Sequence, residues 1–342
     1  MSDLNKPKPT VIIAEIGINH NGNMSLAEEM IEAAAKSGAD AVKFQSYITE
    51  EFLSDETLTY TYRSQGREVT ESQFAMFKRC ELKEEDLHHL RSVCDREGVL
   101  FFSTPMGKAG VDALIRVGTS YLKNGSDCLG HLPLIRHMAK TGIPTILSTG
   151  MATESDIAQA VTAFREAGGA ELTLLACTSS YPTPAASVNL RRIPELARRF
   201  QCAAGFSDHT EGWEAAVASV CLGATMIEKH FTTDRDLPGP DQWFSSDPAE
   251  LAELVRRVRQ VESMLGSPSL THADCEAIAR NEYRVTCGAA RPLRQGHRLC
   301  EDDILFRRPA DGAPPGELDQ LLGKVLLRDL RRGDPIHTEI LS

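Results

Sequence analysis

GFSDHT at residues 205–210 and EKHF at residues 228–231 are the most informative stretches of the sequence. Each is typical of the end of a short buried strand, and the run between them, EGWEAAVASVCLG, indicates one helix. Two strands joined through a helix lie parallel, so we expect His209 and His230 at the same ends of neighbouring strands. Converging imidazoles there can form an open metal site. Because two ligands are fewer than a closed site needs, two unrelated histidines, one of them hydrogen-bonded in the core, are the alternative.

The same alternation of strand and helix recurs along most of the chain. Eight strand-like runs alternate with helical stretches, the last helix being expected over residues 248–266, and this count predicts a (β/α)8 TIM barrel. A doubly wound open sheet is the alternative, but it needs a Gly-rich phosphate loop after the first strand, and INHNGN lacks that pattern. The strand-like runs are 11–17, 41–45, 99–104, 121–126, 144–150, 172–178, 203–209 and 226–231.

Three further segments define the expected domain organisation. Residues 46–80 form a long excursion after the second strand, which we expect to be a lid or rim element on the C-terminal side of the barrel. Beyond residue 283 the helical period fades, and short strands with Gly and Pro turns predict a small β-rich domain. We therefore expect a barrel domain over 1–266, a polar linker over 267–283 and the small domain over 284–342.

Composition excludes several classes of protein. The formal net charge of −11 argues against a nucleic-acid or membrane-surface binder, so an anionic substrate would need locally placed Lys or Arg. The chain has no apolar run long enough to span a bilayer, and from its polar start we expect no signal peptide. Nine cysteines occur singly, which suggests reduced thiols and a cytoplasmic protein.

Polar residues stand at the expected C-terminal end of every strand, where barrel active sites are built. Lys43 and Lys123 lie within apolar strands and would form an anion cradle with nearby hydroxyl groups; one of them as a Schiff-base lysine is the alternative. Glu15 could be a general acid or base if burial tunes its pKa, or only the partner of a lysine. Asp208 and Glu228 could each orient an imidazole or pair with a lysine.

Taken together, the motifs resemble those of the sialic acid synthase family, enzymes that make nine-carbon nonulosonic acids. The resemblance covers roughly residues 11–340, and the C-terminal part resembles the antifreeze-like (SAF) domain of that family. The motifs that carry it are AEIGINHNG (14–22), KFQ (43–45), FFSTP (101–105), KNGS (123–126), LSTGM (147–151), CTSSYPTP (177–184), GFSDHT (205–210), EKHFT (228–232), PGPD (238–241) and RRP (307–309).

The resemblance implies a reaction and a set of site residues. The family condenses phosphoenolpyruvate with an N-acetylmannosamine-type sugar and releases phosphate, using a divalent metal, usually manganese, with magnesium or cobalt as alternatives. His209 and His230 match the metal ligands, and Glu15 matches the acidic group beside the reacting carbons. Residues that match the phosphoenolpyruvate cradle are Lys43, Thr104, Lys123, Ser126, Ser148, Ser179 and Ser207.

Other matches concern the acceptor sugar and a partner subunit. Gln45, Tyr181 and Asp241 match sugar contacts. Arg308 matches an arginine that the SAF domain lends to the partner's barrel in a domain-swapped homodimer. The resemblance therefore implies that these groups surround the sugar.

Two departures from the family pattern lie on the substrate side. Cys128 stands where the family usually has a sugar-contacting glutamate, with Asp127 one residue earlier, and Ser179 stands where an asparagine is common. N-acetylmannosamine, giving N-acetylneuraminate, is the first expectation for the acceptor. The alternative is a 2,4-diacetamido-6-deoxy hexose, giving a legionaminic or pseudaminic acid. Competing functions are a synthase acting on a sugar phosphate, a Schiff-base aldolase, and a barrel that only supports a binding module.

Overall fold

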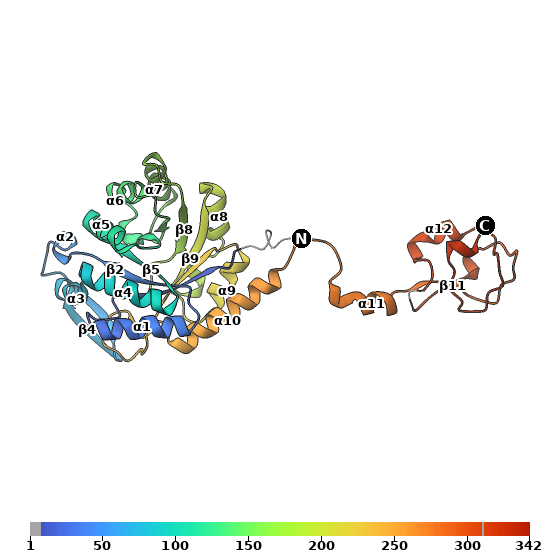
Figure 1. The fold of residues 1–342 in the computed structure, drawn as a ribbon, viewed down its shortest axis with the longest axis horizontal. Helices are drawn as coiled ribbons and strands as arrows, with labels where there is room; N and C mark the ends of the chain where they lie inside the picture. Colours follow the sequence, from blue (N-terminus) through green and yellow to red (C-terminus); the bar gives the residue numbers. More distant parts are fainter. Residues whose placement is uncertain (1–7, 310) are drawn as a thin grey trace. The chain divides into compact units, whose positions relative to one another are not determined.

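The computed structural model describes residues 8–309 and 311–342 (Figure 1). The chain divides into two compact units, Met1–Gly266 and Ser267–Ser342. Within the described residues, no helix is both long enough and apolar enough to cross a membrane. The nine cysteines are all free thiols.

The first unit is a closed barrel of eight parallel strands, as predicted. Around the barrel the strand order is β1-β10-β9-β8-β7-β6-β5-β2, so the first and last strands of the barrel are neighbours. The predicted neighbours that carry the two histidines, β9 and β10, pair in parallel with Ser207 opposite Glu228. The strands are β1 (Val11–Gly17), β2 (Ala41–Ser46), β5 (Leu100–Pro105), β6 (Leu122–Asn124), β7 (Thr145–Ser148), β8 (Leu172–Cys177), β9 (Ala203–Asp208) and β10 (Met226–His230).

Helices cover the outside of the barrel (Figure 1). Their apolar faces and the outward side chains of the strands form two large buried clusters. Two of the helices, α7 and α10, begin with capping boxes at Thr153 and Asp247, which satisfy amide groups that a helix start leaves unpaired. The covering helices are α1 (Met24–Lys36), α4 (Glu84–Glu97), α5 (Lys108–Val117), α6 (Leu132–Ala139), α7 (Glu154–Glu166), α8 (Arg192–Phe200), α9 (Glu214–Cys221) and α10 (Pro248–Leu265).

The inside of the barrel is filled by an apolar layer. Gly205 of β9 faces this packed region, where an added Cβ would lie 2.6 Å from the carbonyl oxygen of Met226 and 2.7 Å from Cδ2 of Leu175. A side chain there would displace its neighbours, because barrel interiors are close-packed. The layer therefore closes the barrel beneath any cavity at its C-terminal end. It consists of Ile13, Ala41, Phe102, Ile146, Leu175 and Met226.

The excursion after β2 is more ordered than a loop. It contains the short helix α2 (Thr49–Phe52), an antiparallel hairpin of β3 (Thr59–Ser64) and β4 (Arg67–Ser72), and helix α3 (Gln73–Cys80). Apolar side chains of this segment, among them Met76 and Phe77, pack with Ile18 at the rim of the barrel. The excursion thus supplies a structured part of the rim.

The second unit contains the predicted small β region. Strands β11 (Thr286–Ala289) and β12 (Ile304–Arg307) pair in antiparallel fashion, and the helices of this unit are α11 (Ala277–Glu282) and α12 (Leu318–Leu321). Its core is a cluster of aliphatic residues and Cys287. The expectation that residues 267–283 act as a linker stays a prediction.

Candidate active site

The floor of the site follows from the two-residue period of the strands. Successive side chains of a strand point to opposite faces, so the residue two positions beyond each member of the apolar layer also points into the barrel. This residue lies closer to the C-terminal end of the barrel, beyond the apolar layer that fills the interior. In chain order these residues are Glu15, Lys43, Thr104, Ser148, Cys177 and Glu228, and all of them line one cavity.

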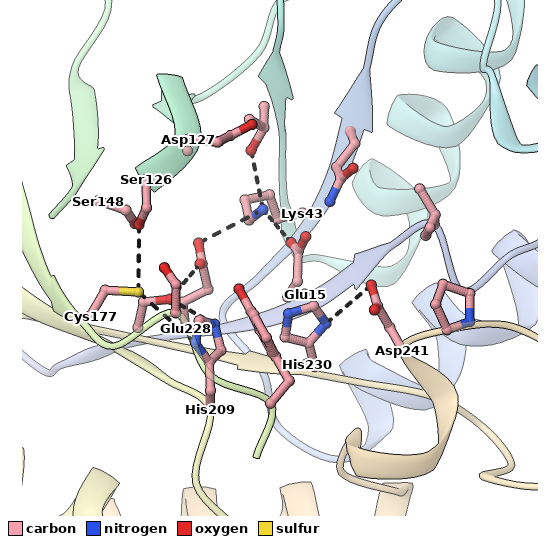
Figure 2. Close-up of a pocket in the computed structure, with 18 of the residues that line it drawn as sticks. Glu15, Lys43, Ser126, Asp127, Ser148, Cys177, His209, Glu228, His230 and Asp241 are labelled. Carbon is pink, nitrogen blue, oxygen red and sulfur yellow. Dashed lines mark hydrogen bonds and ion pairs between the residues drawn. The ribbon is translucent and has the colours of Figure 1, made fainter. Parts of the chain in front are cut away.

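This cavity has a volume of about 480 Å³ and opens at the C-terminal end of the barrel. Figure 2 shows labelled side chains from β1, β2, β7, β8 and β10, and His209 directly after β9, converging on it. The structure brings together all of the predicted site residues that belong to the first unit. Those that line the cavity are Glu15, Lys43, Gln45, Thr104, Lys123, Ser126, Ser148, Ser179, Tyr181, Ser207, His209, His230 and Asp241.

Two lysines and two glutamates form a buried charge cluster at the base of the cavity. Nζ of Lys43 lies 2.5 Å from Oε2 of Glu15 and 3.9 Å from Oε2 of Glu228. Nζ of Lys123 lies 3.3 Å from Oε2 of Glu228. The hydroxyl of Ser207 donates to Oε1 of Glu228 at 2.9 Å. The two ammonium groups and this hydroxyl therefore converge on one carboxylate.

The two glutamates of the cluster differ in acidity. Burial raises the pKa of Glu15 to about 7, against the attraction of Lys43 and with a contribution from the charge of Glu228. Burial acts on Glu228 too, but Lys123 and Lys43 outweigh it and lower the pKa of Glu228 to about 2. Glu228 is thus a fixed anion, whereas Glu15 can gain or lose a proton near neutral pH. That property suits a general acid or base.

His209 and His230 lie side by side, with ring centroids 5.5 Å apart. Nδ1 of His209 lies 2.9 Å from the carbonyl oxygen of Thr178, to which it can donate, and Nε2 lies 3.4 Å from Oγ of Ser207 inside the cavity. Nδ1 of His230 is buried without a hydrogen-bond partner, 3.9 Å from Oδ2 of Asp241. Burial lowers the pKa of His230 well below its usual range. Burial lowers that of His209 as well, but hydrogen bonds to Cys177 and Thr178 outweigh it and the net pKa is raised.

The donor set of this pair fits a divalent cation. A neutral, buried imidazole with an unpartnered nitrogen is a good metal ligand. In residues 8–309 and 311–342, no group of three or more His, Cys, Asp and Glu side chains could hold a metal. A cation bound by His209 and His230 would therefore leave positions for substrate and water, as a catalytic metal requires.

Asp208 and Glu228 were each expected either to orient an imidazole or to pair with a lysine. The structure confirms pairing with a lysine for both. Oδ2 of Asp208 lies 3.0 Å from Nζ of Lys229. Its Oδ1 accepts from the backbone N–H of Thr210 at 2.8 Å. The carboxylate nearest to a histidine of the pair comes instead from Asp241, on the loop after β10.

Several hydroxyl groups that line the cavity lie close to Gly150. The backbone N–H of Gly150 donates to Oγ of Ser126 at 3.0 Å. A Cβ at this position would lie 2.4 Å from Oγ of Ser179 and 2.7 Å from Oγ of Ser126, so only glycine allows the hydroxyls to approach. Oγ of Ser148 is buried without a partner and is free to donate to a ligand.

One wall of the cavity is apolar. Met76 and Phe77 of α3 line it together with Ile18 and Met106. Phe244, from the 3-10 turn after Asp241, packs against the ring of His230 at a centroid distance of 5.1 Å. The cavity therefore combines a charged floor with a hydrophobic side.

Sequence reasoning did not assign roles to several of these residues. Cys177 follows Leu175 by two positions, so strand alternation could have placed it in the cavity. Phe244 and Tyr60 belong to turns and a hairpin outside the barrel strands, and no periodic pattern points to them. Met76 and Phe77 lie in the excursion that was expected to form the rim.

Asp127 and Cys128, at the first departure from the family pattern, differ in position. Asp127 is exposed and lines the cavity, whereas Cys128 is not among the lining residues. Sγ of Cys128 lies 3.7 Å from Oδ2 of Asp127. Arg308 belongs to the second unit, where its guanidinium lies 5.6 Å from the centroid of the Tyr283 ring.

Comparisons with known proteins agree with this geometry. The profile of the NeuB family matches residues 30–269, and that of the SAF domain matches residues 289–341. The N,N'-diacetyllegionaminic acid synthase of Legionella pneumophila is 36% identical over 94% of this chain and 92% of its own length. The human N-acetylneuraminate-9-phosphate synthase is 32% identical over 98% and 93%.

A solved structure is also similar. The N-acetylneuraminic acid (sialic acid) synthetase from Leptospira borgpetersenii superposes with a TM-score of 0.71 at 33% identity, covering 80% of this chain and 90% of the other. The resemblance seen in the motifs is therefore confirmed along nearly the whole chain. The chain belongs to the NeuB family and is a nonulosonic acid synthase that carries a C-terminal SAF domain.

Proposed function

We propose that this synthase condenses phosphoenolpyruvate with the open-chain form of a 2,4-diacetamido-6-deoxy hexose to give a legionaminic-type acid and phosphate. The observation that supports this acceptor is the apolar wall beside the charged floor of one cavity. The relative from Legionella pneumophila, named as an N,N'-diacetyllegionaminic acid synthase, points the same way.

The charged floor suits phosphoenolpyruvate, which carries a phosphate and a carboxylate. Lys43 and Lys123 provide two buried cations, and the hydroxyl groups of Ser126, Ser148 and Ser207 line the same cavity. Charge-assisted hydrogen bonds of this kind are the strong ones in proteins. Thr104, which accepts from Nζ of Lys43 at 3.1 Å, and Ser179 complete the proposed cradle.

The apolar wall suits the acceptor. Ile18, Met76, Phe77 and Met106 offer contacts for two acetamido methyl groups and for the methyl group of a 6-deoxy sugar. The resemblance places at residue 128 a carboxylate that would favour a hydroxyl-rich sugar; here that residue is Cys128, which does not line the cavity, and the lining carboxylate is that of Asp127. Gln45, Tyr181 and Asp241 are the proposed polar contacts to the sugar.

N-acetylmannosamine, the first expectation from the sequence, is the second candidate. It has one acetamido group and more hydroxyl groups, and so makes less use of the wall. The observation in its favour is the similarity to the Leptospira structure, whose name specifies N-acetylneuraminic acid.

The steps of the proposed condensation require particular residues. C3 of phosphoenolpyruvate attacks the aldehyde carbon, and the aldehyde oxygen takes up a proton to become a hydroxyl group. Water adds to the resulting cationic C2 and loses one proton, and the C2–O bond to phosphate then breaks as the new C2 hydroxyl loses its proton and becomes the ketone. The two protons released at C2 balance the one taken up by the aldehyde oxygen and the one taken up by phosphate. Glu15 accepts a proton from the water and returns it to the departing phosphate, which its pKa near 7 permits. Enzymes of the family generally use a divalent metal, and manganese on His209 and His230, or magnesium or cobalt in its place, would supply Lewis-acid polarisation of the aldehyde.

We also propose a domain-swapped homodimer in which Arg308 of each copy serves the barrel of the other. The support is the resemblance of the RRP motif at 307–309. Equilibrium sedimentation tests this: a dimer at micromolar concentration is expected, and a monomer alone would contradict it.

Phosphate release tests the reaction and the acceptor together. Metal-stripped protein is mixed with phosphoenolpyruvate and one of N-acetylmannosamine, its 6-phosphate, or the two 2,4-diacetamido sugars, with and without manganese. We expect manganese-dependent release, with kcat/KM for a diacetamido sugar about tenfold or more above that for N-acetylmannosamine. A preference for N-acetylmannosamine would correct the acceptor, and release with none of the sugars would refute the proposed reaction.

A further inference from the structure

The β3–β4 hairpin rests its tip on the loop that follows β10. Among the residues of both strands, all of which lie in the described part of the chain, Ser64 alone is buried. Its Oγ accepts a hydrogen bond from the backbone N–H of Gly239 at 3.1 Å. A hairpin tip is normally solvated, so the burial of Ser64 is a consequence of this contact.

Two more contacts join the tip to the same loop. Nε2 of Gln65 donates to the carbonyl oxygen of Asp236 at 2.9 Å. The guanidinium of Arg63 lies 5.3 Å from the centroid of the Trp243 ring, within the range of a cation–π interaction. Three consecutive residues of the hairpin therefore hold both ends of residues 236–243.

The inner side of the loop is held by the segment after β1. Nδ2 of Asn21 donates to the carbonyl oxygen of Pro238 at 2.7 Å, and Nε2 of Gln242 donates to that of Asn19 at 2.7 Å. Gly239 lies between the two sides with φ +138°, where an added Cβ would be 3.2 Å from Oδ1 of Asn21. The loop is thus clamped from both sides, and its own backbone leaves little room to shift.

The clamped loop carries cavity-lining groups of the acceptor side. Pro240, Asp241 and Phe244 line the cavity, as does Tyr60 of the hairpin itself. The lysines and serines of the charged floor come from the barrel strands and the turns that directly follow them. A change at the hairpin tip is therefore transmitted to one side of the cavity and not to the other.

We propose that Arg63, Ser64 and Gln65 are positioning residues that set sugar recognition by fixing Asp241 and Phe244 from outside the barrel. This inference rests on the proposed function, in which Asp241 contacts the acceptor. None of the three acts on the substrate directly. Their effect passes through the loop.

Steady-state kinetics separates the two substrates. Ser64→Ala leaves the N–H of Gly239 unpaired, and Arg63→Ala removes the contact with Trp243. In each variant we expect KM for the sugar to rise about fivefold while KM for phosphoenolpyruvate stays within about twofold of wild type. Thr70→Ala, an exposed change on the same hairpin away from its tip, is the matched control and leaves both constants unchanged.

A double-mutant cycle tests whether the tip acts through Asp241. If it does, Ser64→Ala adds little to the effect of Asp241→Asn on KM for the sugar. Fully additive effects, or equal rises in both KM values, would overturn the inference. Gln65→Ala and Arg63→Ala, both at exposed positions, replace Ser64→Ala if that variant does not fold.

Hydrogen exchange tests whether the hairpin tip holds the loop, and it does not require catalytic activity. Amides of residues 236–244 should exchange about fivefold faster in Ser64→Ala, and those of β9 should not change. Unchanged exchange in this loop would overturn the inference even in an active enzyme. If the wild type releases no phosphate with any sugar, the proposed reaction fails, and the exchange comparison still decides whether the tip holds the loop.

Discussion

Nζ of Lys43 lies 2.5 Å from Oε2 of Glu15 at the base of the cavity, and both side chains are buried. Even so, the pKa of Glu15 is raised, because the loss of hydration outweighs the attraction of the lysine. The pair can therefore exist with a proton on the carboxyl group while Glu228 stays ionised beside it. The next two predictions follow from this arrangement.

Replacing Glu15 by Gln should abolish proton transfer without disturbing the fold. We expect kcat for phosphate release to fall about 100-fold or more, since a positioned acid or base contributes that much. Glu15→Asp, which keeps the acid on a shorter stem, should retain more activity. Circular dichroism checks the fold, and a Glu15→Gln enzyme with more than about a tenth of wild-type kcat would exclude the proposed role.

The same substitution should change how stability depends on pH. The pKa of Glu15 is 4.5 in a model peptide and about 7 in the folded protein, so between these values the folded state binds a proton that the unfolded chain has lost. Stability from this group therefore falls as pH rises through that window. We expect Glu15→Gln to raise Tm relative to wild type more at about pH 8 than at about pH 5. Asp241, whose pKa is also raised, is common to both proteins and cancels in the difference.

Lys123 should be needed for both stability and substrate binding. Lys123→Met leaves the buried carboxylate of Glu228 without its nearer cation, and we expect a loss of about 3 kcal/mol of unfolding free energy. Adding Glu228→Gln removes the unpaired charge and should restore most of that loss. KM for phosphoenolpyruvate should stay high in the double variant, because one cation of the cradle is still missing. Denaturant unfolding and initial rates measure the two effects separately.

Metal removal should stop the reaction, and the histidine pair should account for metal binding. We expect chelation to abolish phosphate release and added manganese to restore it. His209→Ala and His230→Ala should each weaken manganese binding about 100-fold, measured from the free-ion signal in electron paramagnetic resonance. His88→Ala is the control, because His88 is exposed on α4. Unaltered manganese binding in both pair variants would place the metal elsewhere.

Residue 128 should influence the choice of sugar. Cys128→Glu restores the carboxylate that the family usually has, and we expect kcat/KM for N-acetylmannosamine relative to a diacetamido sugar to rise about tenfold. Cys221→Glu adds the same charge at an exposed position on α9 and should leave the ratio unchanged. An unchanged ratio in Cys128→Glu would show that Asp127 or the apolar wall decides the preference.

Much of the barrel and its floor could be predicted from the sequence, because both depend on local periodicity. Short apolar runs alternating with helical stretches indicate the strands, and the polar residue near the end of each run indicates the site. Glu15, Lys43 and Glu228 were found in this way. The two-residue period of the strands does not predict how the charges pair, because Glu228 contacts Lys123 only when the barrel has closed.

The rim was predicted less well, for a physical reason. The hairpin within 46–80 turns at Gln65 and Gly66, both with positive φ. Turns of this kind favour Asn-Gly or Asp-Gly, so Gln-Gly gives a weak signal, and the segment was expected only as a long loop. Phe244 was missed because irregular loops are placed by contacts distant in sequence and not by any repeat.

Pairing between β1 and β10 places Glu15 opposite His230 and closes the barrel. During synthesis the ribosome releases the first of these strands early and the second only after most of the barrel has emerged. A nascent chain therefore contains Glu15 long before His230, and the two come together only when β10 pairs with β1. A chain in which β10 has not yet paired with β1 therefore lacks the assembled floor of the cavity, so we expect phosphate release to report only those molecules whose barrel has closed.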